Sequence, residues 1–207
     1  MTEFRSDDPR WQRHPVLGDG DWRILVRPLR PDDDPRIRDL LAHVSQHDLR
    51  LRFFDSIKEF SSEFIARLTH LDYARAMAFV AIDEGSDETL GVVRLHTDSS
   101  REAGEYAILL RSDLKGRGLG WAMMQLIIEY ARFQGLKRVY GQILQENSVM
   151  LKMCRELGFT VTSSTEDRGV YDVTLVVEPV TGRLIIRGAS CGPVRENGWS
   201  PIENSQS

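Results

Sequence analysis

Apolar and polar residues are arranged along the first half of the chain in ways that predict β-strands. Residues 22–27 nearly alternate between apolar and charged side chains, as expected for a strand with one buried face. The apolar runs 77–82 and 89–95 are separated by the polar residues 83–88, which include a glycine and predict a β-hairpin. Residues 105–110 form another apolar run, so we expect them to extend an antiparallel meander.

Apolar residues in this half also recur at helical spacing. The run 32–35, Asp-Asp-Asp-Pro, opens one helical pattern, and Ser61 and Ser62 open another. Residues 49–54 lie between the two and predict a short helix or a turn. The three aspartates are also able to hold a metal ion, but their position before a helix favours a cap.

The second half of the chain continues with further helices and strands. The patterns predict helices over 119–130 and 147–157 and strands over 137–143, 159–161 and 169–177. Taken in order, all these elements predict a mixed α/β (α+β) domain built on a mostly antiparallel sheet.

Length and composition fit one domain with two modest tails. The chain has 207 residues, of which 41% are hydrophobic. We assign residues 1–20 to a flexible leader, 21–180 to the domain and 181–207 to a C-terminal extension. Within the extension, residues 184–186 are compatible with an edge strand, and we expect the Gly-, Pro-, Ser- and Asn-rich remainder to be disordered.

Several classes of protein do not fit the sequence. The chain has no apolar run of about twenty residues, so we expect no membrane span. Its polar, acidic N-terminus is unlike a signal peptide, which predicts a cytoplasmic protein. The net charge of −4 argues against a nucleic-acid partner. Cys154, Cys191 and the scattered histidines lack the spacing of metal ligands, so we expect no metal.

The most informative segment is 111–123, RSDLKGRGLGWAM, between a predicted strand and a predicted long helix. It contains three glycines and three basic residues. Glycines allow the backbone to turn with its N–H groups outward, and the positive end of the following helix attracts an anion. The segment therefore predicts a phosphate-binding turn, although an ordinary strand-to-helix connection is the alternative.

Two spaced motifs resemble those of the GNAT superfamily of N-acetyltransferases. Residues 115–120, KGRGLG, resemble the pyrophosphate signature (Gln/Arg)-x-x-Gly-x-(Gly/Ala), with lysine in the first position. About thirty residues later come Asn147, a predicted helix and then Gly158 and Phe159, as in many members of the superfamily. The resemblance implies helices on both faces of the sheet and a splay between two strands that receives acyl-CoA.

The resemblance also implies the co-substrate and its binding residues. Acetyl-CoA would bind with its pyrophosphate on the glycine turn and its pantetheine arm along the strand that precedes it. A backbone N–H near Leu109 or Leu110 would polarise the thioester carbonyl. The residues assigned to acetyl-CoA are Ile108, Leu109, Leu110, Arg111, Lys115, Gly116, Arg117, Gly118, Leu119, Gly120, Trp121 and Asn147.

Glu105 is the candidate general base. An amine acceptor must lose a proton before it attacks, and GNAT enzymes often place a glutamate in the strand before the glycine turn. Glu105 is the lone carboxylate in this strand, and we expect it to be partly buried. The alternative is a solvated carboxylate at a sheet edge, beside Arg101 and Glu102.

The position at which many members of the superfamily carry a general acid differs in this chain. Many relatives have a tyrosine seven residues after the motif asparagine, where this chain has Cys154. Cys154 has apolar neighbours at helical spacing, so we interpret it as a buried core thiol, while a covalent acetyl-cysteine route remains conceivable. Tyr73, Tyr106 and Tyr140 are other proton donors that the sequence does not rank.

The N-terminal half adds a narrower resemblance. The segments 27–33, 51–54 and 69–81, together with 105–108, resemble the catalytic domain of bacterial Pat-type protein lysine acetyltransferases. That resemblance implies acetyl transfer to a lysine of a protein, in particular an AMP-forming acyl-CoA synthetase such as acetyl-CoA synthetase. Many Pat-type proteins also carry a large synthetase-like or cyclic-nucleotide-binding domain, which the 207 residues do not contain, so the resemblance predicts no route of regulation here.

Two alternative functions share the same acetyl-CoA features. A small-molecule amine N-acetyltransferase would differ only in its acceptor cleft, and a non-catalytic acyl-CoA-binding module would not use Glu105. Phe53, Phe54 and Tyr73 are either core aromatics or contacts to a protein acceptor, and the sequence leaves both interpretations open.

Overall fold

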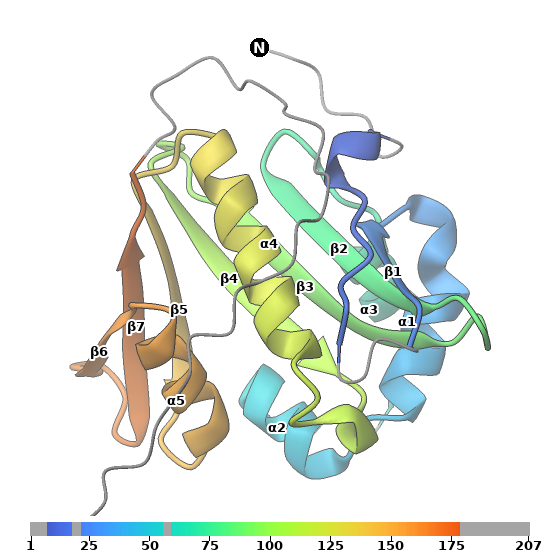
Figure 1. Cartoon of the computed structure of the whole chain (residues 1–207). Helices are drawn as coiled ribbons and strands as arrows, with labels where there is room; N and C mark the ends of the chain where they lie inside the picture. The colour runs from blue at the N-terminus through green and yellow to red at the C-terminus, as the bar shows by residue number, and fades with distance from the viewer. Residues whose placement is uncertain (1–7, 18–21, 56–58, 179–207) are drawn as a thin grey trace, which may run out of the picture.

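A seven-stranded mixed sheet lies at the centre of the computed structural model, which describes residues 8–17, 22–55 and 59–178 (Figure 1). The strand order is β1-β2-β3-β4-β5-β7-β6, and each neighbouring pair is antiparallel except β4 and β5. The strands are β1 (Ile24–Pro28), β2 (Ala76–Asp83), β3 (Thr89–Thr97), β4 (Ala103–Leu110), β5 (Arg138–Leu144), β6 (Thr160–Ser163) and β7 (Val170–Val176). The predicted mixed, mostly antiparallel α/β fold is confirmed.

Helices cover both faces of the sheet, as predicted. Figure 1 shows α4 crossing one face, with α1 and α3 behind the other. One apolar core therefore packs α4 and α5 against the sheet, and a second packs α1, α2 and α3 against the opposite face. The helices are α1 (Asp34–Ala42), α2 (Gln46–Phe53), α3 (Ser62–Thr69), α4 (Leu119–Phe133) and α5 (Ser148–Glu156), with short 3-10 turns η1 (Pro9–Trp11), η2 (Pro31–Asp33) and η3 (Ser112–Leu114).

Side-chain caps set the beginning of three helices. Ser45, Ser61 and Asn147 each accept a hydrogen bond from a backbone N–H in the first turn of α2, α3 and α5. The segment predicted as a short helix or turn is helix α2, which begins at Gln46 because Ser45 caps it. In contrast, α4 begins after Gly118 with no side-chain cap.

The predicted aspartate cap of α1 is wrong in detail. Asp33 makes no side-chain cap hydrogen bond to α1. Its carboxylate instead accepts hydrogen bonds of 2.7 Å from both terminal nitrogens of Arg27 and from the backbone N–H of Arg30. Asp33 is 3% exposed, so this carboxylate forms a buried ion pair that fixes turn η2 to β1.

Part of the predicted leader belongs to the domain. Trp11 is 4% exposed, and its ring lies 5.0 Å from that of Tyr130 on α4. Arg13 forms an antiparallel bridge with Val26 of β1. Residues 8–17 are therefore packed, because an indole buried in the core ties them to the sheet. The assignments for residues 1–7 and 181–207, including the edge strand at 184–186 and Cys191, lie outside the described residues.

Strands β4 and β5 pair over only a short distance before they separate. Ala103, Gly104 and Glu105 pair in parallel with residues 138–140, whereas β4 stays paired with β3 as far as Leu110. Beyond Glu105, the β5-facing edge of β4 therefore has no strand partner. This is the splay that the resemblance to the GNAT superfamily implies.

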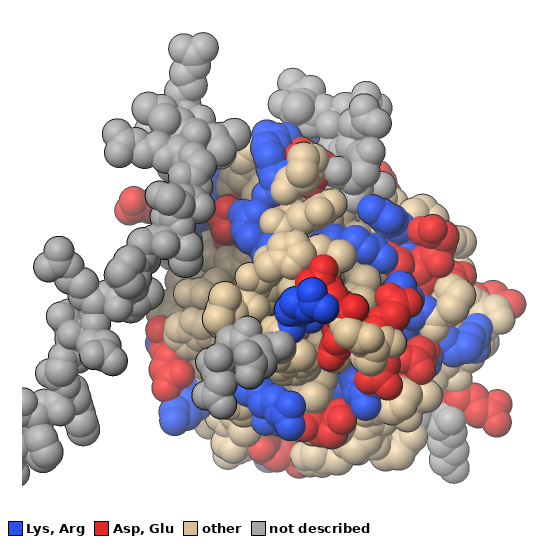
Figure 2. Space-filling model, turned by 45° about the vertical axis from the view of Figure 1, so that its right-hand side comes forward, with Lys and Arg blue, Asp and Glu red and all other residues tan. Residues whose placement is uncertain are grey.

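One side of the molecular surface carries charges of both signs. Figure 2 shows lysine and arginine interspersed with aspartate and glutamate over the side of the molecule that carries α1 and β1. Within the described residues, no helix is long and apolar enough to cross a membrane.

Candidate active site

A cleft of about 920 Å³ begins where β4 and β5 separate. One wall is the strand segment 105–110, and the floor at one end is the glycine turn before α4. Asp48 and residues 51–53 of α2, with Phe54 directly after them, line another side, and α5 lines the side next to β5. Glu105 and the glycine turn thus share one continuous space.

The glycine turn is shaped to bind an anion with its backbone. Gly116 and Gly118 have φ angles of 79° and 87°, in the left-handed region that L side chains rarely adopt. Gly120 lies in the first turn of α4, and a Cβ atom there would come within 3.2 Å of Leu110 Cδ1. Because no side chain caps α4, its first N–H groups face the cleft with the positive end of the helix dipole. This arrangement fits a diphosphate.

Lys115 is held by Asp48 rather than left free in the cleft. Its ammonium group forms an ion pair with the Asp48 carboxylate, which also accepts a hydrogen bond from the Ser112 hydroxyl. Burial acts to raise the pKa of Asp48, but the hydrogen bonds from Lys115, Ser112 and Ser45 outweigh it and lower that pKa. Asp48 therefore fastens α2 to the loop that precedes α4.

Arg111 and Arg117 are the two predicted acetyl-CoA contacts whose side chains the structure does not place in the cleft. Arg111 donates to Glu88 at 2.9 Å and to Asp113 at 3.2 Å. The guanidinium of Arg117 lies 5.6 Å from the centre of the Trp22 ring. Neither residue lines the cleft, so its anion-binding end depends mainly on backbone N–H groups.

The remaining residues assigned to acetyl-CoA line the cleft. They are Ile108, Leu109, Leu110, Lys115, Gly116, Gly118, Leu119, Gly120, Trp121 and Asn147. Leu109 is 7% exposed because its side chain packs into the core beneath α1, so its backbone is the part available to a ligand. Asn147 uses its Oδ1 atom to cap α5, through a hydrogen bond of 3.2 Å from the Met150 N–H.

Glu105 is the last residue of β4 that pairs with β5, at the point where the cleft opens. It lines the cleft and is exposed, so the expected partial burial is wrong. Within the described part of the chain its carboxylate makes no hydrogen bond or ion pair. Its neighbour on β3 is His96, which also lines the cleft. A free carboxylate at this position is able to accept a proton from an amine that enters the cleft.

Cys154 is a core thiol, as the sequence suggests. It is 0% exposed and does not line the cleft, and its Sγ atom lies 3.2 Å from the Tyr106 hydroxyl. Burial raises the pKa of the Cys154 thiol, which disfavours the nucleophilic thiolate. Of the three tyrosines that the sequence leaves unranked, Tyr106 is the one that lines the cleft. Burial raises its pKa as well, so its hydroxyl keeps its proton at neutral pH.

Two aromatic residues at the end of α2 line the cleft, and one of them also packs against the core. Phe53 packs edge-on against Phe64 of α3, with ring centres 5.5 Å apart. Phe54 ends the helix in a left-handed conformation, is 42% exposed and lines the cleft. Tyr73 lies away from the cleft and donates a hydrogen bond to the Leu29 carbonyl.

Sequence reasoning missed three polar residues near Glu105. Arg52 of α2 and Arg94 and His96 of β3 all line this end of the cleft. Arg94 and His96 stand at alternate positions of an otherwise apolar strand, and that alternation was the available signal. Among the described residues, no group of histidine, cysteine, aspartate and glutamate is arranged to hold a metal ion.

Two strands that separate beside a glycine turn and an uncapped helix are the architecture of an acyl-CoA-dependent N-acetyltransferase. The comparison with protein families agrees with this class. Residues 23–160 match the family model described as the acetyltransferase (GNAT) domain. The chain belongs to this family of acetyltransferases.

Individual relatives agree with this assignment. An acetyltransferase of Pseudomonas aeruginosa is 31% identical over 146 residues, covering 70% of this chain and 78% of its own. Acetyltransferase Pat of Mycolicibacterium smegmatis is 27% identical over 162 residues, covering 78% of this chain but only 47% of Pat. The solved GNAT domain of PAT from S. lividans is 25% identical and superimposes with a TM-score of 0.76, covering 84% of this chain and all of that domain.

Proposed function

We propose that this chain transfers an acetyl group from acetyl-CoA to a lysine side chain of a protein, in particular an AMP-forming acyl-CoA synthetase. The observation that carries the reaction type is the free carboxylate of Glu105 at the opening between β4 and β5, in the same cleft as the uncapped N-terminus of α4. The likeness to the GNAT domain of PAT, which covers 84% of this chain, supports a protein lysine as acceptor.

Each part of the cleft has a role in this proposal. Acetyl-CoA supplies an acyl group activated as a thioester. The backbone N–H groups of the glycine turn hold its diphosphate, and the unpaired edge of β4 bonds its pantetheine amides in the manner of an added strand. A main-chain N–H near Leu109 or Leu110 donates to the thioester carbonyl.

Glu105 is the proposed base that removes a proton from the lysine ammonium group of the acceptor. A lysine amine has an unperturbed pKa of about 10.4, so its deprotonation at pH 7 costs roughly 4–5 kcal/mol. Glu105 accepts this proton, directly or through a water molecule, as the amine nitrogen bonds to the acetyl carbon. The carbon–sulfur bond of the thioester then breaks, and coenzyme A leaves as its thiolate. This role distinguishes the proposal from a non-catalytic acyl-CoA-binding module.

Transfer assays with three possible outcomes test the proposal. The purified protein is incubated with radiolabelled acetyl-CoA and either a panel of AMP-forming acyl-CoA synthetases or a panel of small amines. Label on a synthetase, mapped by mass spectrometry to a lysine, supports the proposal. Label on small amines alone would identify a small-molecule acetyltransferase, and coenzyme A binding without any transfer would identify a binding module.

A further inference from the structure

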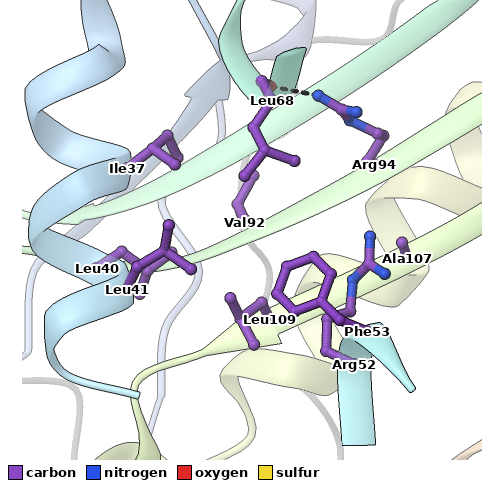
Figure 3. Close-up of a pocket in the computed structure, with 10 residues that line it drawn as sticks. All are labelled: Ile37, Leu40, Leu41, Arg52, Phe53, Leu68, Val92, Arg94, Ala107 and Leu109. Carbon is purple, nitrogen blue, oxygen red and sulfur yellow. Dashed lines mark hydrogen bonds between the residues drawn. The ribbon is translucent and has the colours of Figure 1, made fainter. Parts of the chain in front are cut away.

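Two arginines from different elements meet beside Glu105. Arg94 lies on β3 opposite Ala107 of β4, two residues before His96, which lies opposite Glu105. Arg52 comes from α2, and both arginines line the acceptor end of the cleft. Figure 3 shows the two guanidinium groups on the same side of a small apolar pocket of about 30 Å³ that adjoins the cleft.

Neither guanidinium has a carboxylate partner within the described residues. Arg52 makes no hydrogen bond there, and its guanidinium lies 4.8 Å from the centre of the Phe53 ring. Arg94 uses only Nη2, which donates to the backbone carbonyls of Leu68 and Arg67. An arginine has five N–H donors, so most of the donors of this pair remain available.

Other shielded arginines in the same molecule are paired. Arg27 lies 2.7 Å from Asp33, Arg36 lies 2.8 Å from Asp87, and Arg111 lies 2.9 Å from Glu88. Arg52 and Arg94 depart from this arrangement at the one end of the cleft where an acceptor would enter.

The two unpaired cations make this end of the cleft electropositive. Burial lowers the pKa of Arg94 to about 10, and the charge of Arg52 acts in the same direction. Burial also lowers the pKa of Arg52, while the charge of Glu105 opposes that shift from beyond ion-pair distance. One carboxylate therefore faces two guanidinium groups, and a second anion would balance the charge.

We propose that Arg52 and Arg94 bind a carboxylate that the acceptor carries close to its reacting amine. The inference rests on the proposed acetyl transfer and adds the chemistry of the acceptor. Glu105 receives the amine, and the arginine pair receives the carboxylate a short distance away on the same face of the sheet. Arg94 lies opposite Ala107 within β4, whereas the glycine turn follows the end of that strand and offers a separate binding site for phosphate.

Such a carboxylate has two sources, a glutamate or aspartate beside a target lysine, or the carboxyl group of a free amino acid. The first test compares two end-blocked peptides that differ only in Glu or Gln directly before one lysine. The second compares L-leucine with L-leucinamide. We expect kcat/KM to be at least tenfold higher for the carboxylate member of one pair, because charge-assisted bonds to arginine are strong. The pair that shows the preference identifies the source.

Variants then assign the preference to the arginines. Arg52→Gln and Arg94→Gln should each reduce the carboxylate preference to less than about threefold, whereas Arg52→Lys and Arg94→Lys should retain part of it, since a lysine keeps the charge but not the planar fork. Arg132→Gln, on the exposed end of α4, is the matched control and should keep the full preference. Circular dichroism and the affinity for coenzyme A report whether each variant is folded.

Binding is measured separately, so that a failure of transfer does not obscure the result. In the presence of coenzyme A, the arginine Nε–H signals of Arg52 and Arg94 should shift on titration with the glutamate peptide or L-leucine, and not with the neutral partners. Equal kcat/KM within both pairs, a preference that survives both glutamine variants, or equal binding of charged and neutral probes would overturn the inference. Transfer to no acceptor, with selective binding intact, would instead refute the proposed function.

Discussion

Glu105 is available as a base because of its position on the strand. It is the last residue of β4 that pairs with β5, so its side chain lies where the sheet opens, and no cation of the described residues is close enough for an ion pair. Composition or periodicity does not reveal this. The sequence places a lone carboxylate in an apolar strand, and the divergence of the neighbouring strand exposes it.

Replacing Glu105 should remove the base without removing the binding site. For Glu105→Gln we expect kcat to fall by roughly 10²–10⁴-fold at pH 7, the range of a lost general base. The residual rate should rise about tenfold per pH unit, because the acceptor must then lose its proton to solvent. Steady-state rates from pH 6 to 9 and calorimetry with acetyl-CoA test this. Unchanged turnover across that range would exclude Glu105 from the mechanism.

Cys154 should be inert in the folded protein. The thiolate is the reactive form, and burial both raises the thiol pKa and excludes reagent. In a Cys191→Ser background, we expect iodoacetamide at pH 8 to modify Cys154 at least 100-fold more slowly than it does in 6 M guanidinium chloride, on the order set by exposure and thiolate fraction. Mass spectrometry follows the reaction. Equal rates in the two conditions would reopen the covalent route.

The sequence predicts a site residue best where the residue type and its local position already indicate its role. Glycines before a helix and a lone strand carboxylate are such cases, and the structure places Gly118, Gly120 and Glu105 in one cleft. Arg52 and Arg94 are different, because an arginine on a helix and an arginine on a strand acquire meaning only when the fold brings them together. The same reason explains Asp33, whose partner Arg27 belongs to the preceding strand rather than to the helix it was expected to cap.

At the scale of elements, the beginning of α4 carries the most specific expectation. Gly118 and Gly135 flank this helix, both with positive φ, of 87° and 75°. Alanine at either position should cost about 1 kcal/mol of stability, because an L side chain is strained in that region. Only Gly118→Ala should also weaken coenzyme A binding, by at least about tenfold, since only Gly118 lines the cleft.

Urea denaturation and calorimetry separate the two effects. Gly135→Ala serves as the control for strain, as a Cβ atom there meets nothing within 4 Å. If both variants keep the affinity of the unaltered protein for coenzyme A, the glycine turn does not bind the diphosphate.

The ion pair between β1 and turn η2 should control acid stability. Burial acts to raise the pKa of Asp33, but the hydrogen bonds from Arg27 and Arg30 outweigh it and lower that pKa. A carboxyl group with a lowered pKa stabilises the fold above its unfolded pKa of about 3.9, and this stabilisation disappears as pH falls through the folded value. Asp33→Asn should therefore cost about 3–5 kcal/mol at pH 7, because it leaves Arg27 buried without its partner.

The difference in unfolding free energy between Asp33→Asn and the unaltered protein should shrink as pH falls below about 4. Asp32→Asn, at the exposed neighbouring position, is the matched control and should change stability by less than about 0.5 kcal/mol. A constant difference between pH 7 and pH 3 would show that the charge of Asp33 does not stabilise the fold.

For the molecule as a whole, the division of the sheet has a measurable effect on hydrogen exchange. Strand β4 bonds to β3 along its length, but its other edge has no strand partner after Glu105. Amides on that edge should exchange quickly without ligand and at least about tenfold more slowly with coenzyme A, because an added strand-like partner protects them. Strand β2, paired on both sides, is the internal control. No change in β4 would show that coenzyme A does not bond along this edge.

The order of the elements, more than any motif, determines how far the whole fold can be predicted. Hairpins such as β2–β3 follow from apolar runs separated by a polar turn, and the serine cap predicts α3. The parallel contact between β4 and β5 joins residues separated by a long helix, so its short length depends on packing that local patterns do not contain. The packing of Trp11, distant in sequence from its aromatic partners, was missed for the same reason.

An exposed strand edge normally invites other polypeptides to pair with it and aggregate. Here the open edge is in the middle of the sheet, with α4 and its loop on one face and strands on both sides. A β-strand of another protein could pair with this edge only if β5 moved away. A narrow, flexible ligand such as a pantetheine arm does not require that movement. The unpaired backbone N–H and C=O groups of β4 are therefore accessible to a narrow ligand but not to a β-strand of another protein.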